Sequence, residues 1–252
     1  MQTIRDARAE SDALDEPASE HTAIRATVGH KTVAVEQLQF HLLSPRRYGV
    51  RLLDDAYELW RDVWRSTWQE AKGSTEIYSD EFTRQDEIGV LSLGSTPLSV
   101  TCMRWLDLSR ALAIEDSYFK CWPHEAVTRV AGRQVCVGSN TAVHPEWRRT
   151  LIQPPGASGE PARLAFTAIA LTVRRFVASP AQSLIALTRN DRSIDRILTA
   201  LGSTTLARIQ VCGIDTDVIC VDREKATPAT LVVDDLWRRC RQRMIIEQSN
   251  DE

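Results

Sequence analysis

The chain has 252 residues, of which 43% are hydrophobic and 26% are charged, and its formal net charge is −3. This length supports one hydrophobic core and argues against two large domains. The near-neutral charge argues against a general nucleic-acid binder, and no apolar run reaches the ~18–20 residues of a membrane-spanning helix.

The six cysteines show no CxxC spacing and the five histidines complete no zinc-ligand pattern, so no metal site is expected. We expect reduced thiols that act mostly as small core residues in a cytoplasmic protein. A disulfide between Cys212 and Cys220 is the less favoured alternative. Only four of the 31 basic residues are lysines, so guanidinium groups that bind phosphates or carboxylates are plentiful.

The N-terminal quarter predicts a tail, two strands and a helix. Residues 1–26 are polar and acidic and lack aromatic residues, which predicts a disordered tail rather than a secretory signal. Alternation of apolar and polar residues predicts a strand at 32–40 and another at 48–53. Apolar residues at helical spacing predict an amphipathic helix over 54–71.

This helix can be capped by Asp54 or Asp55, and it carries Trp60, Trp64 and Trp68 on one face. Such a stripe is usually a packing surface. The wall of an acyl pocket or a docking face for a carrier protein is the alternative.

The middle of the chain predicts a meander. Residues 73–87 predict a loop, and 88–109 predict a hairpin. A helix is expected after Pro123. The strand predicted at 134–143 is interrupted by Gly-Ser-Asn, which indicates a bulge or a close approach of another backbone.

The segment that follows the 154–161 loop predicts a buried helix over 162–179, because this segment is apolar nearly all round. Residues 183–188 predict a short strand inside a sheet. Asn190 and Asp191 are expected to cap a helix that is closed by a glycine at its end.

The C-terminal part predicts a hairpin at 204–222 and an amphipathic basic helix at 229–248. The arginines of this helix either pair with neighbouring acids such as Asp234 and Asp235 or dock an acidic carrier or RNA phosphate. They are Arg238, Arg239, Arg241 and Arg243.

The order of elements predicts a mixed α/β fold. The chain has no GxGxxG, P-loop, GxSxG or HExxH motif, which removes most enzyme classes that can be read from a motif.

The most informative stretch is a strand, an exit with the pattern V-x-P-x-W-R, a long apolar helix, a second strand and an Asn-initiated helix that ends in Leu-Gly. This succession resembles the GNAT acyltransferase superfamily. The residues that carry the resemblance are Val143, Pro145, Trp147, Arg148, Asn190, Leu201 and Gly202.

More narrowly, the segments YSDEFTRQDEIGVL, EDSYFKCWP and VGSNTAVHPEWR are similar to the long-chain N-acyl amino acid synthases, which are relatives of the acyl-homoserine-lactone synthases. The resemblance implies a splayed central sheet flanked by helices in one domain over 27–225. The acidic tail 1–26 would precede this domain, and a basic helix and tail over 226–252 would follow it.

The resemblance also implies a reaction. An acyl group would pass from a phosphopantetheine thioester, on an acyl carrier protein or coenzyme A, to the amine of an amino acid or small amine. The thioester is a co-substrate, so no tightly bound cofactor is expected. The acyl carrier protein is the expected partner, and the likeness suggests secondary metabolism. Six cysteines allow a covalent route, but no Cys–His pairing favours it over direct attack.

The resemblance assigns donor binding to residues around the exit of the interrupted strand. Backbone N–H groups near Ala142 and Val143 would polarise the thioester carbonyl. Amides at the next helix N-terminus would bind phosphate with the help of nearby arginines. The implied donor-binding residues are Ala142, Val143, Arg148, Arg149, Thr150 and Asn190.

Two features depart from the superfamily pattern. Residues 151–161 are inserted into the glycine-rich phosphate turn, which favours a single phosphodiester on a carrier protein over the pyrophosphate of coenzyme A. Leu198 stands where many members have a tyrosine that protonates the leaving thiolate.

The general base stays open, with Glu115, Asp116, His144 and Glu146 as candidates. Each of them is otherwise a surface residue or a cap. Ser139 and Asn140 would bind a water molecule or the substrate. The alternative is that their side chains only form hydrogen bonds to backbone groups of a bulge. The acceptor amine would bind to the loop after the first helix, and the alternative is that this loop is only a solvated surface loop. The implied acceptor-binding residues are Asp80, Arg84 and Asp86, with Trp64.

Two other functions remain as alternatives. The arginine-rich C-terminus and the altered phosphate turn also fit an aminoacyl transferase that uses aminoacyl-tRNA as its donor. The missing tyrosine fits a GNAT-shaped binding protein without turnover.

Overall fold

The structure is a computed structural model that describes residues 31–46 and 49–250, with side chains described as far as Gln242. The tail predicted for residues 1–26 lies outside these residues, as do residues 251–252 of the predicted C-terminal tail. The side chain of Arg243 also lies outside the described part.

The centre of the molecule is a seven-stranded sheet with the strand order β2-β3-β4-β5-β8-β10-β9. All neighbouring strands run antiparallel except β5 and β8, which run parallel. The strands are β2 (Leu38–Leu43), β3 (Glu87–Leu93), β4 (Thr96–Asp107), β5 (Gln134–Val143), β8 (Ser183–Arg189), β9 (Thr204–Val211) and β10 (Ile214–Asp222).

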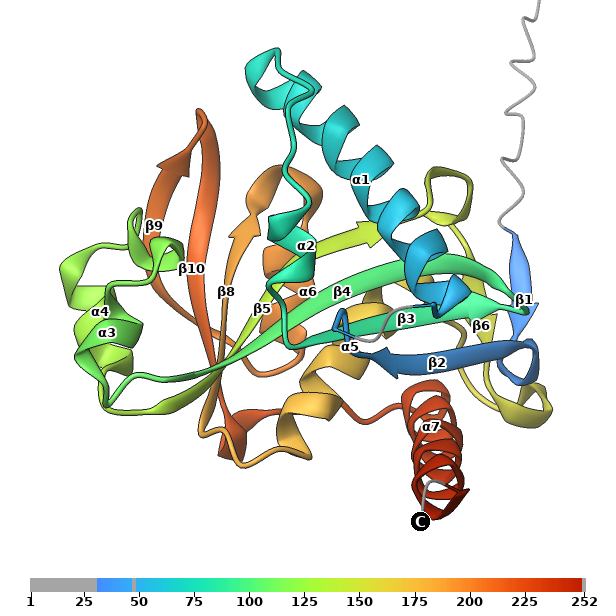
Figure 1. The fold of residues 1–252 in the computed structure, drawn as a ribbon. Coiled ribbons are helices and arrows are strands. Elements are labelled where there is room, and N and C mark those ends of the chain that lie inside the picture. Colours follow the sequence, from blue (N-terminus) through green and yellow to red (C-terminus); the bar gives the residue numbers. More distant parts are fainter. Residues whose placement is uncertain (1–30, 47–48, 251–252) are drawn as a thin grey trace, which may run out of the picture.

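The strands β5 and β8 pair over only three residues each, from Val135 to Val137 against Ser183 to Ile185. Beyond these pairs the two strands diverge (Figure 1). The predicted bulge lies just past the last pair, where Asn140 and Thr141 of β5 stand opposite Thr101 alone. Asn140 has a positive φ of 49° there. The splayed sheet and the bulge expected from the sequence are therefore present.

Helices cover both faces of the sheet (Figure 1). On one face lie α1 (Arg51–Lys72) and α2 (Asp80–Thr83), together with the short helices α3 (Ala111–Ile114) and α4 (His124–Val130). The opposite face is covered by α5 (Leu164–Val177) and α7 (Leu231–Asn250), with α6 (Ile194–Ala200) after β8.

The largest core cluster lies between the sheet and α5, which is buried along most of its length as predicted. Phe40 of β2 packs on Trp237 of α7 with ring centroids 6.4 Å apart. Under α1, the fully buried Trp60 packs against Phe82 at 5.4 Å. Each such aromatic side chain contributes about 1.5–3 kcal/mol through burial.

A second, three-stranded sheet is formed by β1 (Thr32–Ala34), β6 (Leu151–Gln153) and β7 (Ala162–Arg163). The segment inserted into the phosphate turn is therefore structured. Its first strand, β6, pairs with β1 from the other end of the chain. The strand predicted at 32–40 is split into β1 and β2 by a 3₁₀ turn over Val35–Gln37.

Two local predictions are wrong. The predicted strand at 48–53 overlaps the first turn of α1 from Arg51, because Leu53 belongs to the buried helical stripe that continues with Ala56 and Trp60. The predicted caps Asp54 and Asp55 consequently lie inside the helix.

The helix after β8 also begins later than predicted. It follows Ser193, which has a φ of 57°, and no side chain caps it. Asn190 instead donates a hydrogen bond to Asp217 across the sheet, at 3.1 Å.

Two of the four arginines in the basic cluster of α7 pair with a neighbouring acid, as one of the two alternatives predicts. Arg238 and Arg239 both contact Asp235. Arg239 also donates to the carbonyl oxygens of Leu38 and Val35, each at 2.8 Å. This part of α7 therefore holds the edge of the sheet in place.

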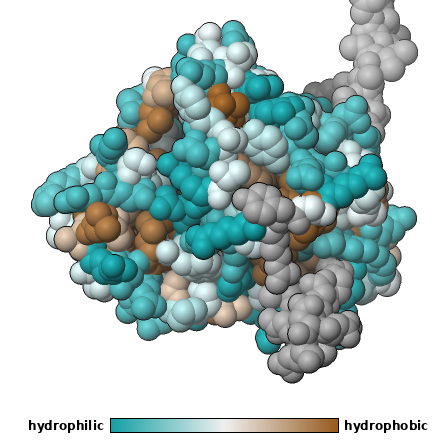
Figure 2. Space-filling view, viewed as in Figure 1, coloured by the Kyte–Doolittle hydropathy of each residue, from teal (hydrophilic) through white to brown (hydrophobic). Residues whose placement is uncertain are grey.

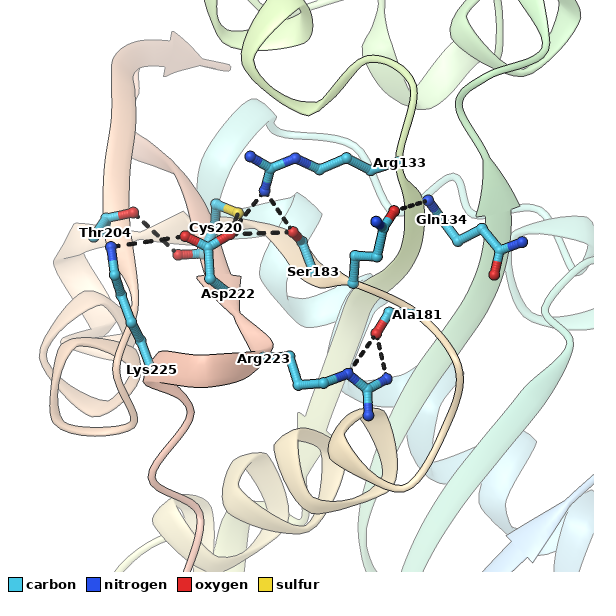
Figure 3. A network of polar contacts seen from close by, with 10 residues as sticks. Arg133, Gln134, Ala181, Ser183, Thr204, Cys220, Asp222, Arg223 and Lys225 are labelled. Carbon is cyan, nitrogen blue, oxygen red and sulfur yellow. Dashed lines mark hydrogen bonds and ion pairs between the residues drawn. The ribbon is translucent and has the colours of Figure 1, made fainter.

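The C-terminal end of α5 is held by Arg223 at the end of β10 (Figure 3). Its guanidinium donates to the carbonyl oxygen of Val177 at 2.7 Å and also to those of Ser179 and Ala181. A cation at this position complements the negative end of the helix dipole.

No helix in the described part of the chain is long and apolar enough to cross a membrane. The exposed surface is mostly hydrophilic in the view of Figure 2, with hydrophobic residues over the α3–α4 region. Leu112 of α3 is the most exposed large hydrophobic residue among those described, at 76%.

We predict that Gly202→Ala destabilises the fold more than Gly213→Ala does. Both glycines have a positive φ, which costs about 1–2 kcal/mol in an L-residue. A Cβ at Gly202 would also lie 1.9 Å from the Lys225 carbonyl oxygen, whereas nothing lies within 4 Å at Gly213. Urea unfolding of both variants measures the difference, and equal losses would contradict the prediction.

Candidate active site

A cavity of about 990 Å³ opens where β5 and β8 separate. It is lined by both diverging strands, by α1 on one face of the sheet, and by α5, α6 and the start of α7 on the other face. The cavity therefore passes through the sheet, and a ligand inside it would contact unpaired edges of both strands.

The wall formed by α1 follows the spacing of one helix face, because residues three or four apart lie on the same side. Trp64 on this wall donates a hydrogen bond from its indole N–H to the Asn140 carbonyl oxygen, at 3.3 Å. This bond fixes α1 over the bulge. The residues of α1 that line the cavity are Val63, Trp64, Ser66, Thr67 and Glu70.

The tryptophan stripe serves two purposes. Trp60 is fully buried in the core, whereas Trp64 lines the cavity. Trp68 packs on Trp64 with ring centroids 5.5 Å apart.

The wall on the other face is mostly apolar and forms a chamber between α5, α6 and α7. Leu198 belongs to this wall and is 4% exposed, so an apolar side chain stands where the superfamily pattern has a tyrosine. The other apolar side chains of the chamber are Phe166, Ile169, Val173, Leu184, Ala186, Ile194, Ile197 and Val232.

Five arginines line the cavity, and we call them the arginine rim: Arg148, Arg163, Arg189, Arg192 and Arg196.

Two members of the rim have acidic partners. Arg189 pairs with Asp191 at 2.8 Å, and Arg192 pairs with Glu70 of α1. The other three, Arg148, Arg163 and Arg196, form no ion pair with any residue that the structure describes. They are available to an anionic ligand.

The donor-binding residues expected from the sequence are only partly brought together. Val143 and Arg148 line the cavity. Ala142 faces the core under α1, and Thr150 is buried behind the rim, where its carbonyl oxygen accepts from Leu164 N–H at 3.0 Å. Arg149, which is exposed, and Asn190 do not line the cavity.

The expected catalytic residues divide in the same way. Ser139 and Asn140 line the cavity at the bulge. Glu115 is exposed at the end of α3, and His144 lies past the end of β5, where its Nδ1 accepts from the Glu146 N–H at 3.3 Å. Neither Glu115 nor His144 lines the cavity.

Of the residues expected to bind the acceptor, only Trp64 lines the cavity. Asp80 and Arg84 are exposed on and beside α2. The Asp86 carboxylate accepts a hydrogen bond from the Trp105 N–H at 2.8 Å, which ties it to β4.

Sequence reasoning missed the two carboxylates in the lining, Glu70 and Glu160, and most of the arginine rim. The helical stripe from Val63 through Thr67 points to Glu70. The arginines offer no comparable pattern, because their common location depends on how the strands and helices pack.

The segment after β8 that carries part of the rim is anchored by Asp217 of β10, whose side chain is 4% exposed. Hydrogen bonds from Arg208, at 2.6 and 3.0 Å, chiefly hold the pKa of Asp217 below its ordinary value, and Asn190 adds to this effect.

No protein-family model matches this chain, and no curated protein matches its sequence. Two solved structures of BjaI, a CoA-dependent acyl-homoserine lactone synthase, are similar in fold. Each is 15% identical and covers 81% of this chain and 89% of its own. The TM-score is 0.52 for the complex with SAM and isopentyl-CoA, and 0.51 for the complex with MTA.

FeeM, an N-acyl amino acid synthase from uncultured soil microbes, is 12% identical, with a TM-score of 0.47, and covers 78% of this chain and 97% of its own. The likeness to BjaI shows the fold, and the protein has the GNAT-like architecture that its sequence predicts.

We predict that Asp217→Asn weakens the acid dependence of stability. Because the folded-state pKa of Asp217 is lowered, its contribution is present above the ordinary value of 3.8 and is lost as the pH falls through the lower folded value. Denaturant unfolding between pH 6 and about pH 2 should show a shallower loss of stability in the variant below about pH 4. An unchanged slope would contradict the prediction.

Proposed function

We propose that the protein is an N-acyltransferase that moves an acyl group from a phosphopantetheine thioester to the amine of an amino acid or small amine. The observation that carries this proposal is the cavity through the sheet at the separation of β5 and β8. It offers two reactants separate approaches, one from each face of the sheet, to a common point between the strands.

The diverging strands suit the pantetheine arm. Past Val137 and Ile185, the edges of β5 and β8 that face each other lack each other's hydrogen bonds. An extended arm with two amide groups can supply donors and acceptors to such edges, as an added strand does. The acyl chain would extend into the apolar chamber.

The three rim arginines that form no described ion pair, Arg148, Arg163 and Arg196, support an anionic donor. Arg148 is exposed at the exit of β5, next to the inserted segment that forms β6 and leads into β7. Because this insertion replaces the glycine-rich turn, the rim fits a single phosphodiester on a carrier protein better than a pyrophosphate. Coenzyme A remains the second candidate donor, since the solved relative BjaI is described as CoA-dependent.

The chemistry we propose is direct attack. The neutral amine adds to the thioester carbonyl carbon, and the nitrogen of the tetrahedral intermediate gives its extra proton to water. The intermediate then collapses, and the carbon–sulfur bond breaks with its electron pair leaving on the pantetheine sulfur, which is released as the thiolate and takes up a proton from solvent. Cys102 lines the cavity, but burial raises the pKa of its thiol far above the ordinary value. This thiol stays protonated at neutral pH and is a poor nucleophile, which supports a reaction without an acyl-enzyme.

We predict that Arg148→Ala raises KM for the thioester donor roughly 10- to 100-fold, because it removes a charged hydrogen-bond donor to phosphate. Arg110→Ala is the matched control, since Arg110 is equally an exposed arginine but lies outside the cavity. Thermal unfolding first checks that both variants are folded. Steady-state kinetics then measures KM for the thioester donor in each variant. An unchanged KM would remove Arg148 from the donor site.

The proposed activity is tested by mass spectrometry on a mixed reaction of the protein with acyl-carrier and acyl-coenzyme A thioesters, pooled amino acids and amines. Amide product from carrier donors alone is expected. Product from coenzyme A donors would mean that the inserted segment still accommodates a pyrophosphate. No product and no thioester consumption would favour an aminoacyl-tRNA donor or a binding protein.

A further inference from the structure

An ion pair crosses the open end of the cavity. Glu70, near the end of α1, contacts the guanidinium of Arg192, which ends the 3₁₀ turn Asn190–Arg192 after β8. Both residues line the cavity. The pair therefore joins the helix above β5 to the segment that leaves β8, on either side of the gap between the two strands.

The location of Glu70 follows from the helix. It continues the cavity-facing stripe of Val63 and Thr67, and it lies ~9 Å beyond Trp64 along the helix axis. Trp64 is fixed to the bulge of β5 by its bond to Asn140. The carboxylate thus stands on the side of the cavity where the chain leaves β8.

The location of Arg192 follows from the turn. Asp191 is held by two hydrogen bonds from Arg189, at 3.1 and 2.8 Å. Arg192 Nε lies 3.7 Å from the same Asp191 carboxylate, so the guanidinium has a second acidic neighbour. Arg192 keeps this neighbour when its contact with Glu70 opens.

Both partners of the pair are accessible to solvent and to a ligand. The side chains of Glu70 and Arg192 are 56% and 46% exposed, and exposed ion pairs contribute little to stability. A molecule that carries both an ammonium and a carboxylate can replace each half of the pair, and both charges then keep an opposite partner. The described lining contains the carboxylates of Glu70 and Glu160. Glu70 has a guanidinium partner beside it, whereas Glu160 forms no ion pair with a described residue.

We propose that Glu70 and Arg192 form the acceptor site and that its ligand is a zwitterionic α-amino acid. The ammonium binds Glu70 and the carboxylate binds Arg192, which places the nitrogen at the α1 mouth of the cavity, facing the thioester between the strands. The ammonium gives one proton to water before the neutral amine attacks. This inference rests on the proposed transferase function and restricts its acceptor to one chemical class.

The test compares amino acids with their decarboxylated amines, using phenylalanine with phenethylamine and leucine with 3-methylbutylamine. Arg192→Gln should raise KM for the amino acids about 10- to 100-fold and leave KM for the amines within about twofold, because only the carboxylate loses its partner. Glu70→Gln should raise KM for both kinds of acceptor.

Matched controls separate this role from a general effect of charge. Glu125→Gln removes an exposed carboxylate of α4 outside the cavity, and Arg65→Gln removes an exposed arginine of α1 outside the cavity. Neither should change KM for any acceptor. Thermal unfolding should be nearly unchanged in all four variants, since the pair is exposed.

Three results would overturn the inference. Equal KM effects of Arg192→Gln on amino acids and amines would mean that Arg192 binds no acceptor carboxylate. An unchanged KM in Glu70→Gln would remove Glu70 from the site. In both cases amide formation by the wild type would leave the transferase proposal intact. No amide from any acceptor with the wild type would overturn both proposals together.

Discussion

The architecture depends on the short length of the hydrogen-bond ladder between β5 and β8. β5 and β8 share three residue pairs and then part at a bulge. A buried backbone that lacks a sheet partner is unfavourable, so the edges past the last pair bind other groups: Trp64 donates to the Asn140 carbonyl oxygen, and the groups that line the cavity are open to water or a ligand. Helices on both faces keep the gap open: α1 is fixed to the bulge through Trp64, and α5 closes the opposite side. The cavity is the space that remains between them.

Features that depend on local periodicity could be predicted from the sequence. The hairpin of β3 and β4, the buried helix α5 and the interrupted strand β5 all match their patterns. The interruption of the strand points to Ser139 and Asn140, and the resemblance to the acyltransferases points to Val143 and Arg148; all four line the cavity. Here one short segment of chain determines both the pattern and the geometry.

Features that depend on packing could not be predicted. Glu70 and Arg192 lie on separate elements, and nothing in either local pattern brings them together. Ala142 follows the bulge, which shifts the alternation of side chains along the strand, so its methyl group points into the core. Asp86 resembles a loop residue in the sequence, yet its carboxylate is bound to the backbone of β4.

The pairing of β1 with β6 has a consequence for the order in which the protein folds. The inserted segment next to Arg148 gains its strand partner from residues 32–34, more than a hundred positions earlier in the chain. Contacts of such sequence separation close large loops and tend to form after local hairpins and helices. The neighbourhood of Arg148 should therefore become ordered among the last parts of the molecule, after the seven-stranded sheet already has its shape.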